Sequence, residues 1–96
     1  NEIVKTYSLS QNYPNPFNPV TKIRFTLPVN SNVRITVYNV LGKEVAKLVD
    51  RSMPLGSYTV DWTANNFASG VYFYKVVAEG NDGSRFVNTK RMILIK

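Results

Sequence analysis

Strict alternation of apolar and polar residues in short runs is the feature that most constrains how this 96-residue chain can fold. Ile23, Phe25 and Leu27 alternate with polar residues, and the segments 33–38 and 58–62 repeat the pattern. Successive side chains of a β-strand point to opposite faces, so each run predicts a strand with one buried face. We therefore expect an all-β protein whose sheets are each covered on one side.

Turn-forming residues separate these runs at short intervals. Asn30-Ser31-Asn32, the turn after residue 38 and Gly80-Asn81-Asp82-Gly83 each favour a tight connection. Residues 71–79 are largely apolar on both faces, as in a central strand, and residues 84–96 predict a last strand. Short strands at a spacing of about 8–12 residues predict an Ig-like antiparallel β-sandwich of about seven strands, with the strand order left open.

Three segments depart from the simple alternation. Residues 43–49 have a mixed pattern that fits neither strand nor helix cleanly, and residues 50–56 are expected to form a loop because of Pro54 and Gly56. Residues 1–8 are expected to be a linker from an upstream domain, and residues 9–96 the sandwich. The chain opens with neither an initiator Met nor a basic-then-apolar leader, so we expect a piece of a longer protein.

The composition disfavours catalysis. The chain has no Cys and no His, which removes disulfides, thiolate and imidazole chemistry and the commonest zinc ligands. Most of its six acidic residues fall at predicted turns or strand ends, which disfavours a pair of catalytic carboxylates. We therefore predict that the domain is not an enzyme and holds no cofactor and no metal, since hairpin geometry explains Asn81 and Asp82. The net charge of +6 is spread along the chain, which disfavours nucleic-acid binding.

The aromatic residues allow two interpretations. They can fill the core of a small domain without disulfides, or one or two can be exposed as platforms on which sugar rings stack. We expect the core role, and the alternative function is a carbohydrate-binding or cell-surface attachment module of a polysaccharide-degrading enzyme. A plain spacer is a third alternative. The nine residues concerned are Tyr7, Tyr13, Phe17, Tyr38, Tyr58, Trp62, Tyr72, Phe73 and Tyr74.

The segment Lys90-Arg91-Met92-Ile93-Leu94-Ile95-Lys96 places four consecutive apolar residues between cations. This pattern is typical of a buried final strand with charged residues at its ends, which limit aggregation. It also suits a terminal strand that another protein recognises, by edge pairing or from its free end. Physical reasoning on the sequence leaves both interpretations open.

Taken together and in order, the motifs resemble the type A C-terminal sorting domain of the type IX secretion system. The run Tyr13-Pro14-Asn15-Pro16-Phe17-Asn18-Pro19 is similar to the opening of that family, and Lys90 to Lys96 is similar to its ending. Blocks around Tyr38-Asn39-Val40-Leu41-Gly42 and Ser69-Gly70-Val71-Tyr72 match its middle. The middle blocks also occur in the Ig-like domain of flagellar hook-capping (FlgD-like) proteins, so the two ends carry the resemblance to a sorting domain.

The resemblance implies a non-catalytic label that directs a larger cargo protein of a Gram-negative bacterium of the Bacteroidetes or related groups across the outer membrane. It implies passage through the periplasm and then a secreted or cell-surface location. The implied partners are the type IX outer-membrane translocon, a sortase-like peptidase that cuts within residues 1–8, and the covalently attached upstream cargo, which in the family becomes released or linked to surface lipopolysaccharide.

The motifs also assign expected roles to individual residues. We expect deletion of residues 90–96 to block sorting and to leave the rest folded, and we read Gly42, Gly70 and Gly83 as setting the shape of turns. Pro14, Pro16 and Phe17 are expected to staple their loop to the sandwich. The expected sorting signal is Lys90, Arg91, Met92, Ile93, Leu94, Ile95 and Lys96, and the family motif residues are Pro14, Asn15, Pro16, Phe17, Tyr38, Gly42, Gly70 and Tyr72.

Overall fold

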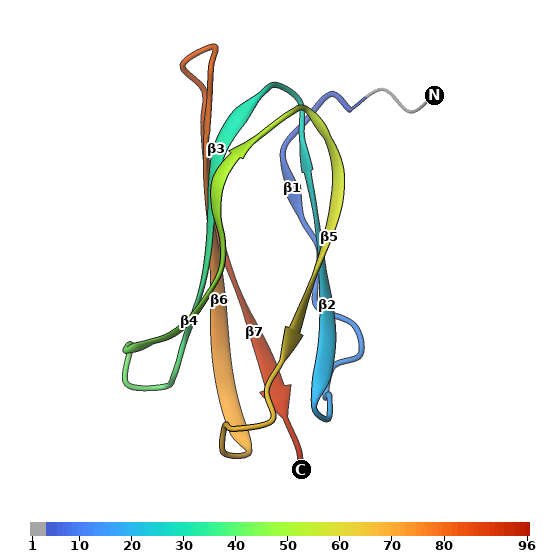
Figure 1. Ribbon diagram of the computed structural model, residues 1–96, viewed down its shortest axis with the longest axis vertical. Coiled ribbons are helices and arrows are strands. Elements are labelled where there is room, and N and C mark those ends of the chain that lie inside the picture. Colours follow the sequence, from blue (N-terminus) through green and yellow to red (C-terminus); the bar gives the residue numbers. More distant parts are fainter. Residues whose placement is uncertain (1–3) are drawn as a thin grey trace.

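The computed structural model describes residues 4–96 and consists of two antiparallel sheets packed face to face (Figure 1). One sheet has the order β1-β2-β5, from β1 (Ser8–Leu9), β2 (Val20–Leu27) and β5 (Gly56–Thr63). The other has the order β4-β3-β6-β7, from β4 (Glu44–Met53), β3 (Ser31–Tyr38), β6 (Gly70–Gly80) and β7 (Arg85–Leu94). The prediction of an all-β, Ig-like antiparallel sandwich of about seven strands is confirmed.

The described residues contain no helix, and so none that is long and apolar enough to cross a membrane.

The core lies between the sheets and follows from the alternation in the sequence. The odd-numbered apolar residues of β2 and β3 face inward, and Ile23, Ile35 and Val37 are completely buried. β6 lies beside β3 in the same sheet, and Tyr74 and its alternate neighbours add to the core from that sheet, opposite β2. Each large apolar side chain that is fully buried contributes about 1.5–3 kcal/mol relative to exposure, so this two-sided burial holds the sheets together without disulfides.

β4 resolves the ambiguous segment and corrects one prediction. Residues 44–49 begin this strand, which continues to Met53, and Gly56 already begins β5. The loop predicted over 50–56 is therefore wrong for residues 50–53 and 56, and only Pro54 and Leu55 form it. Register shifts relative to β3 occur between Ile35 and Thr36 and again between Val37 and Tyr38. Such β-bulges break the period-two pattern, and the exposed polar residues of an edge strand then look like a loop in the sequence.

β1 was not anticipated from the sequence. Ser8 pairs with Thr26 and Leu9 with Phe25, so this strand of two residues extends the sheet beside β2. Just before it, the ring of Tyr7 stacks on Phe86 with centroids 5.4 Å apart. Ordered contacts therefore begin within the segment predicted to be a linker, of which residues 1–3 lie outside the described part. The division between linker and sorting domain at residue 9 stays a prediction.

Two glycines have the backbone conformation that their turns require. Gly42 has φ +80° in the β3–β4 hairpin, and Gly83 has φ +87° in the β6–β7 hairpin. L-residues with side chains rarely adopt these angles. Beside Gly83, the Asp82 carboxylate accepts hydrogen bonds from the Ser84 hydroxyl and the Ser84 amide, which lower the pKa of Asp82. The hairpin itself thus accounts for the Gly-Asn-Asp-Gly sequence.

Candidate functional site at the C-terminal strand

β7 forms one edge of the four-stranded sheet and pairs with β6 along its length, from Arg85 opposite Glu79 to Leu94 opposite Gly70. Met92 and Leu94 are completely buried in the core. Lys90 and Ile93 are half-buried. The exposed side chains of the predicted signal are Arg91, Ile95 and Lys96, and Ile95 is 54% exposed. The two interpretations of this segment therefore apply to different residues, because some fill the core and others face solvent.

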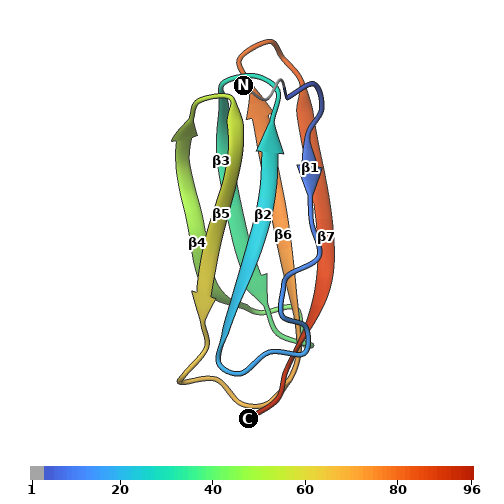
Figure 2. The same ribbon diagram turned by 90° about the vertical axis from the view of Figure 1, so that its right-hand side faces the viewer.

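The segment between β1 and β2 runs beside the end of β7 (Figure 2) and closes its outer edge. The Gln11 side-chain amide donates to the Arg91 carbonyl at 2.6 Å. The Ile93 amide donates to Asn15 Oδ1 at 3.0 Å, and the Ile93 carbonyl accepts from the Phe17 amide at 3.0 Å. The Ile95 amide donates to the Phe17 carbonyl at 3.0 Å. We call residues 11–17 the edge cap.

Phe17 anchors the edge cap in the core. Its side chain is 2% exposed, and its backbone forms a parallel bridge opposite Leu94. The Phe17 ring lies 5.7 Å from that of Trp62, centroid to centroid, and the Trp62 ring lies 5.5 Å from that of Tyr72. The Tyr72 hydroxyl donates to the Ala68 carbonyl at 2.7 Å. The rings of Phe17, Trp62 and Tyr72 therefore form one aromatic cluster behind the terminal strand. This cluster joins the motif at residues 13–19 to the motif at residues 69–72.

A polar network that the sequence did not reveal fixes the start of the edge cap. Asn12 is 2% exposed, and its side-chain amide donates to Thr21 Oγ1 at 2.9 Å and to the Pro14 carbonyl at 3.1 Å. Thr21 Oγ1 also donates to the Pro14 carbonyl at 2.9 Å. The signal available in the sequence was an Asn two residues before a Pro, since Asn side chains often bond to the backbone two residues further on.

Tyr74 was also missed as a contributor to this region. It is fully buried in β6, and its hydroxyl donates to the Ser10 carbonyl at 2.7 Å, just before the edge cap. Burial raises the pKa of Tyr74 to about 12, because the charged phenolate would lose its hydration; a hydrogen bond with the backbone of Asn12 opposes this effect. Tyr74 therefore remains neutral and keeps donating throughout the physiological pH range.

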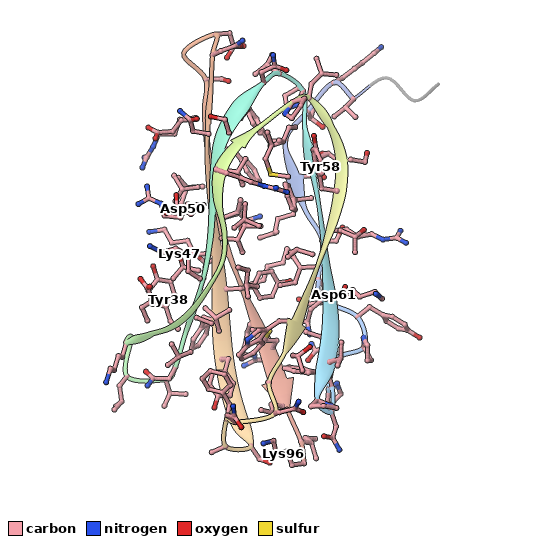
Figure 3. The ribbon with its side chains drawn as sticks, viewed as in Figure 1. Tyr38, Lys47, Asp50, Tyr58, Asp61 and Lys96 are labelled. Atoms are coloured by element: carbon pink, nitrogen blue, oxygen red, sulfur yellow. The ribbon has the colours of Figure 1, made fainter. Side chains whose placement is uncertain are left out.

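The loop 65–69 holds the last residue on the other side of the strand. The Lys96 amide donates to Ser69 Oγ at 2.9 Å, and the Lys96 ammonium donates to the Asn65 carbonyl. Figure 3 shows Lys96 at the end of the sandwich where β7 finishes. The exposed end of the predicted signal is thus attached to the folded domain and does not hang from it.

The central motif residues do not join this site. Tyr38 ends β3, two strands away from β7 across the sheet, and Gly42 lies in the β3–β4 hairpin that projects from the sandwich (Figure 1). That hairpin exposes Val40 and Leu41, the latter by 87%. Gly70 starts β6 with φ +153°, directly opposite Leu94. Of the family motif, the edge cap, Gly70 and Tyr72 therefore adjoin the terminal strand, whereas Tyr38 and Gly42 do not.

Neither metal ligands nor an aromatic platform accompanies this site. Within residues 4–96, no three acidic side chains gather in a way that could hold a metal ion. Of the nine aromatic residues considered as sugar platforms, Tyr13 alone is exposed, by 79%, and the others are buried or half-buried. Tyr13 is thus the one ring of these nine that could serve as a platform, and no finding supports the carbohydrate-binding alternative.

Comparison with protein families matches residues 11–94 to the model described as "Secretion system C-terminal sorting domain". The chain belongs to this family, and it is a C-terminal sorting domain of the type IX secretion system. Such domains mark proteins for export across the outer membrane to a secreted or cell-surface state, act with the secretion machinery, and are not themselves catalytic. Comparison with curated protein sequences gives no match.

Two solved structures show the same fold. Dimeric latent PorU from Porphyromonas gingivalis aligns with a TM-score of 0.72 and 17% identity, over 96% of this chain and 10% of the PorU chain. CopC from Methylosinus trichosporium OB3b aligns with a TM-score of 0.60 and 17% identity, over 93% of both chains. The match to PorU thus involves only a tenth of that protein. At these identities the likeness concerns the fold alone.

Proposed function

We propose that this domain, itself without enzymatic activity, carries its attached cargo across the periplasm and presents residues 90–96 to the type IX outer-membrane translocon as the sorting signal. The exposed side chains of Arg91, Ile95 and Lys96 on an ordered end of the sandwich support this proposal. Two cations that flank an apolar residue suit a partner surface with carboxylates and an apolar recess. This exposed group is the observation on which the proposal depends.

The fate of the cargo forms the second part of the proposal. A sortase-like peptidase cuts within residues 1–8, after which the cargo is released or joined to surface lipopolysaccharide. Lys5 and Thr6 are exposed and precede β1 in the chain. A protease cleft can reach such a segment without opening the core, because proteases act most readily on exposed terminal segments.

The deletion suggested by the sequence is a poor test. Removing residues 90–96 also removes Met92 and Leu94, which are completely buried, and the pairing with the first half of β6. We therefore expect the deletion to destabilise the whole domain and not to leave the rest folded, because loss of two core side chains costs several kcal/mol, about 2–5 for each large-to-small change. Substitution of exposed side chains separates recognition from folding.

The experiment uses a fluorescent protein with a periplasmic export signal, fused to this domain, in a host with a working type IX system. The test variant is Arg91→Ser/Ile95→Ser/Lys96→Ser. The matched control, Lys22→Ser/Arg85→Ser/Val87→Ser, removes the same charge and one exposed apolar residue elsewhere. We expect wild type and control in the medium and the test variant in the periplasm, with all three equally stable. Normal export of the test variant would contradict the proposal.

A further inference from the structure

The outer edge of β7 has a closed half and an open half. Odd-numbered residues direct their backbone groups away from β6, as the hydrogen bonds of Ile93 and Ile95 to Asn15 and Phe17 demonstrate. From the carbonyl of Arg91 to the amide of Ile95, the edge cap supplies partners for these groups. In the described chain, the outward groups of Val87 and Thr89 have no such partner, because β6 is the only strand beside β7 and the contacts of the edge cap begin at Arg91.

This division conflicts with recognition of the signal by strand pairing. A partner strand gains affinity from unpaired backbone groups. Such groups are available near Val87 and Thr89, whereas the signal at residues 90–96 lies mostly in the closed half. A partner that bound by pairing with the backbone of β7 would therefore bind beside residues 90–96 and not on them. The side chains of Arg91, Ile95 and Lys96 remain accessible while the edge is closed.

Opening the edge cap would bring a pairing partner little gain. An incoming strand could replace the hydrogen bonds that Asn15 and Phe17 already make to Ile93 and Ile95. It would also leave empty the core position of the Phe17 ring beside Trp62. A ligand shifts a conformational equilibrium only by its different affinity for the two states. A partner strand would exchange one set of hydrogen bonds for an equal set, and the packing of the Phe17 ring would be lost. The partner therefore has no higher affinity for the open state than for the closed state.

We propose that the edge cap stays closed during recognition, so that the sorting partner reads side chains on the capped end and does not add a strand to β7. This inference rests on the proposed function of residues 90–96. The recognised surface then combines Arg91, Ile95 and Lys96 with Pro14, Asn15 and Pro16, which are among the exposed residues of the cap. The first and last motifs of the sequence thus form one surface of the folded domain.

The first experiment tests whether the cap exists in solution, independently of secretion. Amide hydrogen exchange is measured by NMR for the wild-type chain, Asn15→Ala and the control Asn18→Ala, which alters an exposed residue next to the cap. We expect the Ile93 and Ile95 amides to be protected in wild type and control. In Asn15→Ala the Ile93 amide loses its acceptor and exchanges at least about tenfold faster, with Val76 unchanged. Rapid exchange at Ile93 and Ile95 in wild type would overturn the proposal.

The second experiment locks the cap. Phe17 forms a parallel bridge with Leu94, and the residues that precede them, Pro16 and Ile93, are chosen for an engineered disulfide across the closed edge. The chain has no cysteine, so Pro16→Cys/Ile93→Cys introduces one defined pair. Fused to the exported fluorescent protein, the double variant is studied with its disulfide formed and, in a host that lacks the periplasmic disulfide oxidase, with both thiols reduced. The substitutions at Pro16 and Ile93 are then the same in both arms, and gel mobility without reductant follows disulfide formation.

Export of the disulfide-locked form within about twofold of the reduced form supports recognition with a closed cap. Periplasmic retention of the locked form, with the reduced form exported, overturns it and indicates that strand pairing is used. Failure of the wild-type fusion to reach the medium counts against the proposed function instead, and the hydrogen-exchange result then decides the closed cap alone. The two proposals can therefore fail separately.

Discussion

β4 and β7 are the two edges of the same sheet and each has ten residues, yet their exposed edges are protected differently. β4 has two register shifts against β3 and carries charged residues such as Lys47 and Asp50, which point away from the sandwich (Figure 3). β7 is regular against β6, and the edge cap covers its last part. Irregularity and charge suffice to prevent unwanted pairing. Of the two edges, only the covered one keeps a regular strand.

The largest expected effect comes from removing the anchor of the covered edge. Phe17→Ala leaves a cavity beside Trp62 and lowers the free energy of unfolding by about 3–5 kcal/mol. Val45→Ala on β4 removes a half-buried side chain and lowers it by only about 1 kcal/mol. Urea denaturation followed by tryptophan fluorescence measures both. Equal losses would mean that the cap contributes no more to stability than the bare edge does.

The hairpins that precede the two edge strands also differ. A Cβ added to Gly80 would lie 2.4 Å from Ser84 Oγ and 2.4 Å from the Tyr7 hydroxyl oxygen, so Gly80→Ala destabilises by about 1–3 kcal/mol through overpacking. A Cβ added to Gly42 would meet open space, so only the φ of +80° disfavours a side chain at this position. Since Asn tolerates this conformation better than Ala, Gly42→Asn is expected to be more stable than Gly42→Ala. Thermal unfolding of the three variants tests this contrast, and a fully stable Gly80→Ala contradicts it.

Two tyrosines allow the comparison to be made at the level of one hydrogen bond. Tyr74 donates from the core to Ser10, and Tyr58 donates to the Pro54 carbonyl at 2.7 Å where β4 joins β5. Tyr74→Phe is expected to cost about 1 kcal/mol, and Tyr58→Phe less, because its hydrogen bond is exposed. Chemical denaturation at pH 7 compares the two variants with wild type.

The Tyr74 hydroxyl also predicts a dependence on pH. Its pKa is raised to about 12 in the folded domain, so the unfolded chain loses this proton first as the pH rises. The contribution of Tyr74 to stability is therefore complete below about pH 10 and is lost between about pH 10 and 12. The stability difference between wild type and Tyr74→Phe is expected to shrink over that range. A constant difference would mean that the hydroxyl is not desolvated.

The smallest effect is expected at the charges of the bare edge. Lys47 and Asp50 are 3.7 Å apart, and both side chains are exposed. Lys47→Ala is expected to change stability by less than about 0.5 kcal/mol, because exposed ion pairs contribute little. Light scattering at raised protein concentration then tests whether the residue instead keeps the β4 edge soluble. A large loss of stability would show that this edge depends on the ion pair itself.

Alternation predicted the strands that have one face in the core, and it predicted the fold class. It failed at β4, whose register against β3 shifts between Ile35 and Thr36 and between Val37 and Tyr38, and at β1, which is too short to show a period. Exposed and buried members of residues 90–96 follow the same alternation. The edge cap could not be predicted, because contacts such as the hydrogen bond from Ile93 to Asn15 depend on how distant segments meet and not on local pattern.

The distance along the chain between the edge cap and β7 has a consequence for synthesis. Asn15 and Ile93 are 78 residues apart, so this contact closes only when almost the whole sandwich has assembled. Contacts between distant residues form late, because their loops are costly to close. A domain that is still folding, or has misfolded, therefore lacks the closed edge cap. A transport system that recognises the capped end would export only cargo whose sorting domain has completed folding.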